Sequence, residues 1–487
     1  MRDSIKKLAG ETAIYGLSSI LGRILNYLLV IVHTRVFLPD AYGVVTELYS
    51  YVAILMVIFT FGMETTFFRF TTRDKDPDIY KVASSWVMII SFFMAGAIYL
   101  NASFLEGWLQ IPDSSQYIRW LALILFLDSF IAIPFAKLRI ENRPWKFAIA
   151  KLVMILLTVG LNLFFLLGLP HLAETGSSLG QYYDPEIGVG YIFLANLIGS
   201  ASVYIILIRE LFSLRLKLDP AKLGPMLLYA TPILLTGLAG MLNENLDKIL
   251  FRRLFPSDIG INEQDALGIY GAAFKLSIFM MLGIQAFRYA AEPFFFNKSE
   301  EKDSRELFAR VLHYFVLVCL VIFVGVSLNV ELIGKIFLRK PEFWQALYIV
   351  PVLLLAKLLF GIYVNLSIWF KITDRTIFGT YFSLAGVVIT VVFNLLLVPR
   401  MGFMGAALAS LACYATMALL CYVKGQKEYP IPYKMGPIFL HILVASAWVG
   451  LVYFWSPGTW VSLFLSVIYL GIIYLWEFKN KIISRTT

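Results

Sequence analysis

The sequence predicts an all-α, polytopic membrane protein of about fourteen transmembrane helices. The 487-residue chain is 59% hydrophobic, and only 15% of its residues are charged. A soluble domain carries roughly one charged residue in four, because its surface faces water. Apolar stretches of membrane-spanning length recur from residue 12 to residue 476, so no soluble domain separates from the rest.

The expected spans follow one another along the whole chain. Six are centred near Gly22, Ile54, Ile90, Phe126, Ile155 and Ile198. Eight more are centred near Thr236, Met281, Val318, Leu358, Val388, Cys413, Ser446 and Val467. The tenth and eleventh are separated at residues 371–375. The apolar run that follows the polar lead 1–11 is too long for a signal-peptide core, so we interpret it as a retained first helix.

The distribution of basic residues predicts the orientation. With the N-terminus inside, about 27 of the 41 Lys and Arg fall on the cytoplasmic side and about 8 outside. The loop 169–187 holds three acids and no Lys or Arg, as expected of an external loop. We therefore expect both termini in the cytoplasm. The predicted cytoplasmic cations include Arg69, Arg73, Lys75, Lys81, Lys137, Arg139, Arg143, Lys146, Arg209, Arg215 and Lys217.

Cysteine and histidine spacing predicts no metal site and no disulfide. Cys319, Cys413 and Cys421 lie in apolar segments, which favours small buried hydrophobes. The four histidines show no HExxH or paired spacing, and the chain has no GxxxxGK[ST] motif, which argues against an ATPase. No cofactor is expected, although coupling to H⁺ or Na⁺ is open.

Two sequence patterns occur twice and indicate an internal repeat. RVFLPDAYG at 35–43 is echoed by RLFPSD at 253–258 and LGIYG at 267–271. LNLF at 161–164 is echoed by FNLL at 393–396, and each is followed by a glycine-rich helix start. We infer that helices one to six are duplicated as helices seven to twelve, with both copies in the same orientation. The last two helices are then an appendage.

The chain resembles the polysaccharide transporter branch of the multidrug/oligosaccharidyl-lipid/polysaccharide (MOP) superfamily, the Wzx-type flippases. The similarity lies in LPDAYG at 38–43, FGME through Arg69-Phe70 at 61–70, and Asp247-Lys248 leading to LGIY at 267–270. It continues with Asn394-Leu395 to Pro399 and the small residues Gly402, Gly405, Ala406 and Ala407. Together these stretches cover helices one to twelve.

This resemblance implies a fold, a cargo and a location. The fold has two pseudo-symmetric six-helix lobes around a central cavity, here 1–218 and 219–425, with the appendage at 426–487. The cargo is an undecaprenyl-diphosphate-linked oligosaccharide, an O-antigen, capsule or exopolysaccharide repeat unit, moved by alternating access. The location is the bacterial inner membrane, where a polysaccharide polymerase and chain-length proteins are possible partners. The resemblance does not imply an enzyme.

The predicted spans contain about a dozen ionisable side chains. Such groups cost several kcal/mol each at membrane depth unless they are paired or hydrated, so they usually line a cavity. The cations are Arg23, Lys151, Lys248, Lys275, Arg288 and Lys357. The acids are Glu47, Glu64, Asp128, Glu244, Asp247 and Glu292.

Helix one offers the first candidate for substrate binding. Ser19, Arg23 and Asn26 share one helix face, and Arg23 lies about half-way through the span. A guanidinium suits a diphosphate because its planar fork can donate two hydrogen bonds. The alternative is a structural ion pair with an acid such as Glu47.

Helices seven and eight carry further candidates. Asp247 lies on a polar stripe of helix seven and is a coupling or gating candidate, whereas Glu244 and Lys248 at i, i+4 are equally compatible with mutual neutralisation. On helix eight, Arg288 and Glu292 share one face, with Lys275 about a third of a turn away and nearer the outside. Lys275 and Arg288 are predicted substrate ligands, although Arg288 paired with Glu292 is as compatible with the spacing.

The remaining candidates are assigned to coupling, gating or structure. Glu47, Glu64, Asp128, Asp247 and Glu292 form the coupling and gating set. Arg69 is interpreted as a cytoplasmic anchor, and Asp128 and Lys357 are compatible with pairs inside a lobe.

Three classes of function differ in the sequence features that they require. The intramembrane cations favour an anionic cargo, as in a lipid-linked oligosaccharide flippase. More acidic lobes would favour a drug or metabolite antiporter of the related toxin-extrusion (MATE) branch. A lipid II flippase also carries an anionic cargo and fits the intramembrane cations equally. A membrane glycan polymerase or glycosyltransferase usually has a large external loop or an acidic catalytic motif near the membrane surface. The loop 169–187 contains no such motif.

Overall fold

The computed structural model describes residues 21–22, 24–212, 214, 216–256, 260–298, 301, 303–455 and 458–476. Within these ranges the chain is helical and contains no β-strand, which confirms the all-α class. Every expected span centre falls inside a helix. The separation expected at residues 371–375 is also found, because one helix ends at Ile372 and the next begins at Ile377.

The chain divides into two compact units, residues 1–249 and 250–487. The boundary falls inside α12 (Pro220–Leu254), so this helix begins in the first unit and ends in the second. The lobe boundaries expected at 218/219 and 425/426 stay predictions.

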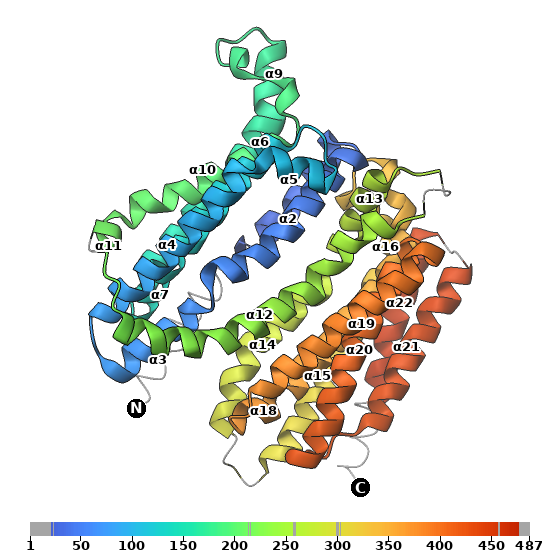
Figure 1. Cartoon of the computed structure of the whole chain (residues 1–487). Coiled ribbons are helices and arrows are strands. Elements are labelled where there is room, and N and C mark those ends of the chain that lie inside the picture. The colour runs from blue at the N-terminus through green and yellow to red at the C-terminus, as the bar shows by residue number, and fades with distance from the viewer. Residues whose placement is uncertain are drawn as a thin grey trace. The chain divides into compact units, whose positions relative to one another are not determined.

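The first unit is built from long helices in antiparallel succession (Figure 1). α4 packs on α6, α8 packs on α10, and α6 packs on both α2 and α10. The elements before α12 are α2 (Pro39–Thr60), α3 (Met63–Asp74), α4 (Asp78–Leu100), α5 (Ala102–Leu109), α6 (Ser115–Phe130), α7 (Ala132–Ile140), α8 (Pro144–Leu163), α9 (Leu169–Glu174), α10 (Gly190–Ile206) and α11 (Ile208–Phe212). A π-helical turn, Phe164–Gly168, joins α8 to α9.

The break between α2 and α3 depends on a glycine. Phe61 and Gly62 both have left-handed backbone angles, with φ of 51° and 64°. A Cβ on Gly62 would lie 3.1 Å from the carbonyl oxygen of Ala230 and 3.0 Å from a methyl group of Ile233, both on α12. The glycine therefore supplies both the backbone conformation and the close approach of α12.

The second unit has its own helical core (Figure 1). α20 packs on α17 and α19, while α15 packs on α17 and on both appended helices, α21 and α22. The elements are α13 (Glu263–Lys275), α14 (Ile278–Lys298), α15 (Ser304–Leu328), α16 (Val330–Phe337), a 3₁₀ segment (Pro341–Ile349), α17 (Val350–Leu366), α18 (Ile368–Ile372), α19 (Ile377–Met401), α20 (Phe403–Glu428), α21 (Met435–Trp455) and α22 (Thr459–Tyr474).

The helices have the length and composition of a multi-pass membrane protein. In the described parts of the chain, ten helices are long and apolar enough to cross a membrane, or eleven if the bent pair α13–α14 is one span. Three shorter apolar helices accompany them, Ile24–Val36, Gly190–Ile206 and Thr459–Ile473. The membrane class is confirmed, and the count of fourteen stays a prediction.

Matched glycines in the two units support the internal repeat. Gly188 precedes α10 with φ 49° and ψ −124°. Gly402 precedes α20 with φ 52° and ψ −122°. These angles are strained for any residue with a Cβ, so the repeated glycine-rich helix start reflects the same backbone turn in both units.

Matched side chains show the same repetition. The Asn162 amide donates to the carbonyl of Thr158 at 2.9 Å, and the Asn394 amide donates to that of Thr390 at 2.7 Å. Ring pairs also recur at corresponding places. His33 lies 6.4 Å from Tyr42 between ring centres in the first unit, and Phe251 stacks on Tyr270 at 4.8 Å in the second. These local contacts therefore recur at matched positions of the two units.

Candidate functional site

The predicted site residues are distributed over both units. Asn26, Glu47, Glu64, Asp128 and Asp247 belong to the first unit, and Lys275, Arg288 and Glu292 belong to the second. Arg23 lies outside the described residues, and so does the side chain of Glu292, although its backbone lies in α14. The expectation that Arg23, Lys275 and Arg288 line one space stays a prediction.

Two of the candidate acids, Glu47 and Asp128, lie on α2 and α6 of the first unit. Glu47 on α2 is fully buried, whereas Asn26 on the preceding helix is exposed. Asp128 on α6 lies beside Ser200 of α10 and interacts electrostatically with Lys151 of α8. Lys151 also places its ammonium 4.4 Å from the ring centre of Phe135. The charged groups of α6 and α8 thus lie close together inside one unit.

Glu64 is paired within the first unit. It lies on α3 and accepts a hydrogen bond from Arg139 of α7, whose guanidinium also lies 4.6 Å from the ring centre of Phe68. Arg69, five residues after Glu64 on α3, is exposed and lies 4.1 Å from the ring centre of Tyr229 on α12. The basic side chains at this end of the unit therefore hold α3 against both α7 and α12.

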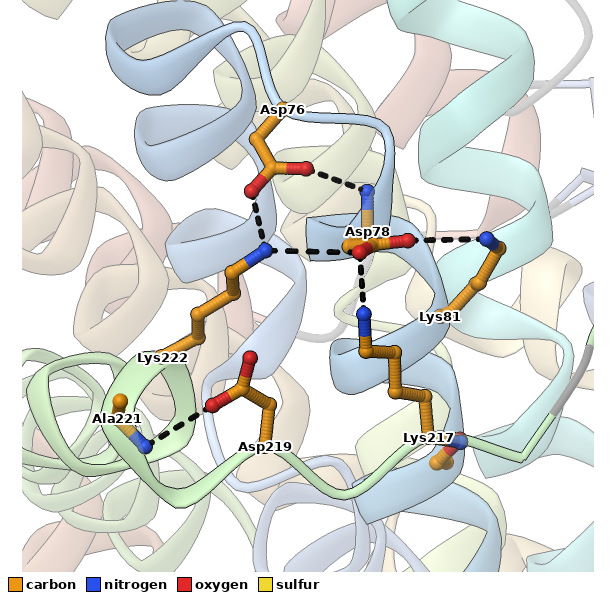
Figure 2. Close-up of polar contacts among 8 residues, drawn as sticks. Asp76, Asp78, Lys81, Lys217, Asp219, Ala221 and Lys222 are labelled. Atoms are coloured by element: carbon orange, nitrogen blue, oxygen red, sulfur yellow. Dashed lines mark hydrogen bonds and ion pairs between the residues drawn. The ribbon is translucent and has the colours of Figure 1, made fainter.

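An ion-pair network joins the α3–α4 turn to the start of α12 (Figure 2). Asp78 accepts hydrogen bonds from Lys81 at 2.9 Å and from Lys217, and Lys222 donates to Asp76. Lys222 also lies 3.6 Å from Asp78. The Lys222 ammonium and the backbone N–H of Asp78 hold the pKa of the Asp76 carboxyl below its ordinary value. These side chains are partly exposed, so the network contributes more to positioning than to stability.

A second ion-pair cluster forms around Glu210 of α11. Its side chain is only 4% exposed and is held by Lys146 at 2.6 Å and Arg143 at 3.0 Å, at the start of α8. The Tyr80 hydroxyl donates to the Glu210 carbonyl at 3.2 Å. Burial disfavours the charged carboxylate, but the Lys146 hydrogen bond and the two positive charges hold the pKa of Glu210 below its ordinary value.

These two clusters bring together three basic segments that the sequence places on the same side. They are the α3–α4 turn, the α7–α8 turn and the stretch 208–222, which the ion pairs hold at one end of the first unit. The distribution of basic residues placed most of their Lys and Arg on the cytoplasmic side, but the sequence did not identify Asp76, Asp78 or Glu210 as partners. In the sequence these three acids were visible only as acidic residues within basic loops.

On α12, Lys248 contacts both Asp247 and Glu244. The Lys248 ammonium lies 3.2 Å from the Asp247 carboxylate and donates to the backbone carbonyl of Glu244 at 2.6 Å. Asp247 and Lys248 are buried. A charge pair with its neighbour reduces the cost of burying Asp247.

The continuous eighth helix expected from the sequence is wrong. α13 and α14 meet at a bend of 42° after Lys275. The relation of a third of a turn between Lys275 and Arg288 applies only to a straight helix, so it does not hold across this bend. Lys275 is half-buried at the end of α13, whereas Arg288 on α14 is exposed.

Two features of the second unit could not be read from residue spacing. Lys357 is buried, with its ammonium 4.9 Å from the ring centre of Phe274 and 5.4 Å from that of Tyr414. Cation–π contacts of this kind hold a charge inside an apolar bundle. His313 and His441, 128 positions apart in the numbering, have ring centres 5.8 Å apart. The described residues contain no cluster of three or more metal-ligating side chains.

The sequence profile of a family described as polysaccharide biosynthesis protein matches residues 8–297. This is more than half of the 487-residue chain. No curated protein matches the chain by sequence at a significant level.

Solved structures with the same fold are transporters. The inward closed conformation of the lipid II flippase MurJ has a TM-score of 0.72 at 12% identity, covering 96% of this chain and 99% of that chain. An inward-facing multidrug resistance MATE family transporter of the MOP superfamily has a TM-score of 0.64 at 13% identity, covering 83% and 94%. The bent form of the Vibrio cholerae MATE transporter VcmN has a TM-score of 0.55 at 13% identity, covering 87% and 96%. The chain therefore has the multi-pass fold of MOP superfamily transporters, which the sequence resemblance predicted.

Proposed function

The chain belongs to the polysaccharide biosynthesis protein family, and we propose that it is a flippase for a lipid-linked oligosaccharide. The cargo would be a polyprenyl-diphosphate-linked repeat unit, moved from the cytoplasmic to the outer leaflet of a bacterial inner membrane. Two observations together support the proposal. Over residues 8–297 the sequence matches a family of polysaccharide biosynthesis, and nearly the whole chain shares the fold of a lipid II flippase.

The chemistry of the cargo fits the charges in the chain. A polyprenyl diphosphate has a long apolar tail and a dianionic head, so only the head and the sugars need a polar path. In our proposal the tail stays in lipid while the head meets cations at membrane depth, with Arg23, Lys275 and Arg288 as ligands and Asn26 beside them. A guanidinium binds a phosphate by two parallel hydrogen bonds, whereas an ammonium acts as a point charge.

Transport would proceed by alternating access of the two repeated lobes. The ion pairs at the predicted cytoplasmic end support a gating role, because Glu64–Arg139 joins α3 to α7 and the Asp76–Asp78 network joins the α3–α4 turn to the start of α12. Among the coupling candidates, Glu47, Asp128 and Asp247 are acids at membrane depth and would be the H⁺ or Na⁺ sites. A polymerase and chain-length proteins would act on the delivered repeat unit.

Lipid analysis of a deletion strain tests the cargo. We expect a polyprenyl-diphosphate-linked repeat unit to accumulate on the cytoplasmic leaflet, measured by its protection from a membrane-impermeant sugar-oxidising reagent added to intact cells. Expression of the protein should restore access to the reagent. Accumulation of lipid II instead would assign the cargo of the lipid II flippase. Normal lipid-linked glycans with altered drug tolerance would favour the antiporter and contradict our proposal.

A further inference from the structure

The second unit contains a cavity of about 510 Å³ beside the two appended helices. Its walls are the end of α15, the start of α16, the 3₁₀ segment Pro341–Ile349 and the facing ends of α21 and α22. The topology predicted from the basic residues places this end outside. The volume lies within the range of roughly 300–1,000 Å³ that is usual for small-molecule sites.

Two residues that line the cavity carry buried polar atoms. Ser327 is 4% exposed and Asn329 is 8% exposed. The Asn329 amide nitrogen donates to the carbonyl of Gly325 at 2.8 Å and to the Ser466 hydroxyl at 3.1 Å, which fixes the side chain. Within the described residues, the Ser327 hydroxyl and the Asn329 Oδ1 have no hydrogen-bond partner. Leaving such buried groups unpaired is costly, so an occupant toward which these side chains turn, and with which they pair, would be stabilised.

One wall of the cavity presents a fixed aromatic ring. Trp344 is half-buried, and its indole N–H donates to the carbonyl of Leu338 at 2.7 Å. The ammonium of Lys335 lies 5.6 Å from the ring centre. Tyr348, one helical turn after Trp344, adds a second aromatic side chain to the lining. A ring held in this way offers a rigid apolar surface at little cost in conformational entropy.

The charge of the lining is balanced. Glu331 and Lys335 lie one turn apart on α16 and both line the cavity. One acid and one base give no net attraction for a dianion, so the lining does not select a diphosphate. Hydroxyls, a carboxamide oxygen and opposite charges provide both donors and acceptors.

We infer that this cavity is a saccharide-binding site. A sugar ring has apolar C–H faces that match the Trp344 ring, and each of its hydroxyls both donates and accepts, as pairing with Ser327 and Asn329 requires. The ligand class is a neutral or weakly charged sugar of one to three units. The site gives the appended helices a role, because α21 and α22 supply one side of it. That the sugar belongs to the transported cargo rests on the proposed flippase function.

Saturation-transfer NMR on the full-length protein in nanodiscs tests the site directly. The probes are maltose and N,N′-diacetylchitobiose, with farnesyl diphosphate as the charged comparison. We expect transfer to at least one disaccharide, and about fivefold weaker binding in Trp344→Leu, the size expected for loss of an aromatic contact. Ser327→Ala removes only the buried hydroxyl and should also weaken binding. Trp460→Leu is the matched control, because Trp460 is 84% exposed and does not line the cavity.

The possible results separate the site from the proposed function. No transfer to either disaccharide, or equal transfer in Trp344→Leu, Ser327→Ala and wild type, would overturn the site. If these variants lose the disaccharide and also slow glycan export at normal protein level, the sugar is part of the cargo. If they lose it while export is unchanged, the site stands and its ligand is a free glycan. A deletion strain with no trapped lipid-linked glycan would refute the flippase and leave the binding result unaffected.

Discussion

Asn162 and Asn394 make the same hydrogen bond in two different units of the chain. Each donates its side-chain amide to the backbone carbonyl of a threonine four residues earlier, and each is fully buried. The partners of the amide oxygens differ, because Asn162 Oδ1 lies 3.1 Å from the His33 ring whereas Phe251 occupies the position that corresponds to His33. The duplicated units have thus kept one polar contact and diverged at the next.

This difference predicts unequal costs for the same substitution. Asn162→Leu removes the buried hydrogen bond between Asn162 and the His33 ring, which costs about 1–3 kcal/mol. Asn394→Leu breaks no corresponding bond to a ring and should cost less. The midpoint of thermal unfolding in detergent measures both. Equal midpoints would contradict the assigned role of His33.

The two matched glycines predict sensitivity to a single methyl group. Gly188→Ala and Gly402→Ala would each place a Cβ in a backbone conformation that costs about 1–3 kcal/mol. Gly160→Ala is the control, since Gly160 is helical and a Cβ there meets no atom within 4 Å. We expect less folded protein in membranes for the first two variants and no loss for the third. Equal yields of all three would contradict the matched turns.

Glu210 predicts a loss of stability in acid. Its folded pKa is depressed below the ordinary value of 4.5, so its stabilising contribution is present above that pH and is lost as the pH falls through the folded pKa. Glu210→Gln should lower the unfolding midpoint at pH 7 and flatten its dependence on pH below about 4.5. The exposed Glu174, changed to Gln, is the control and should behave as wild type. The same acid response in wild type and Glu210→Gln would remove this role.

The distribution of basic loops predicts which residues are accessible from outside. A cysteine at Gly176 should react with a membrane-impermeant maleimide in intact cells, and a cysteine at Lys75 should react only after lysis. The native cysteines are buried and provide a low background. The reverse labelling pattern would invert the whole topology.

Arg23 distinguishes substrate binding from structural pairing. If its guanidinium meets a diphosphate, Arg23→Lys should retain partial glycan export and Arg23→Ala should lose more, each at a normal level of membrane protein. If it is a structural pin, Arg23→Ala should lower the amount of folded protein, because a buried partner acid loses its counter-charge. Export measured together with protein level separates the two. Normal export at normal level for Arg23→Ala would contradict both.

Much of the fold could be predicted from the sequence because hydropathy alone determines which segments enter a membrane. The repeat was also visible, since turns such as Gly188 and Gly402 tolerate few substitutions. Contacts between distant segments were not predictable. The pairing of Glu210 with Lys146 and the proximity of His313 to His441 depend on tertiary packing. Such contacts produce no recognisable residue spacing in the sequence. The bend after Lys275 was missed for a related reason, because the apolar pattern continues across it without a proline or glycine.

The 35-residue helix α12 contains two prolines at which it bends more easily than elsewhere. Pro225 and Pro232 lie inside it, and neither can donate the backbone hydrogen bond that would stiffen the preceding turn. The backbone of Gly62 lies against α12 at Ala230 and Ile233, next to Pro232. The helix therefore bends most easily near Pro232, where the break between α2 and α3 contacts it. A force applied at either end of α12 would bend the helix at this point instead of moving it as a rigid rod.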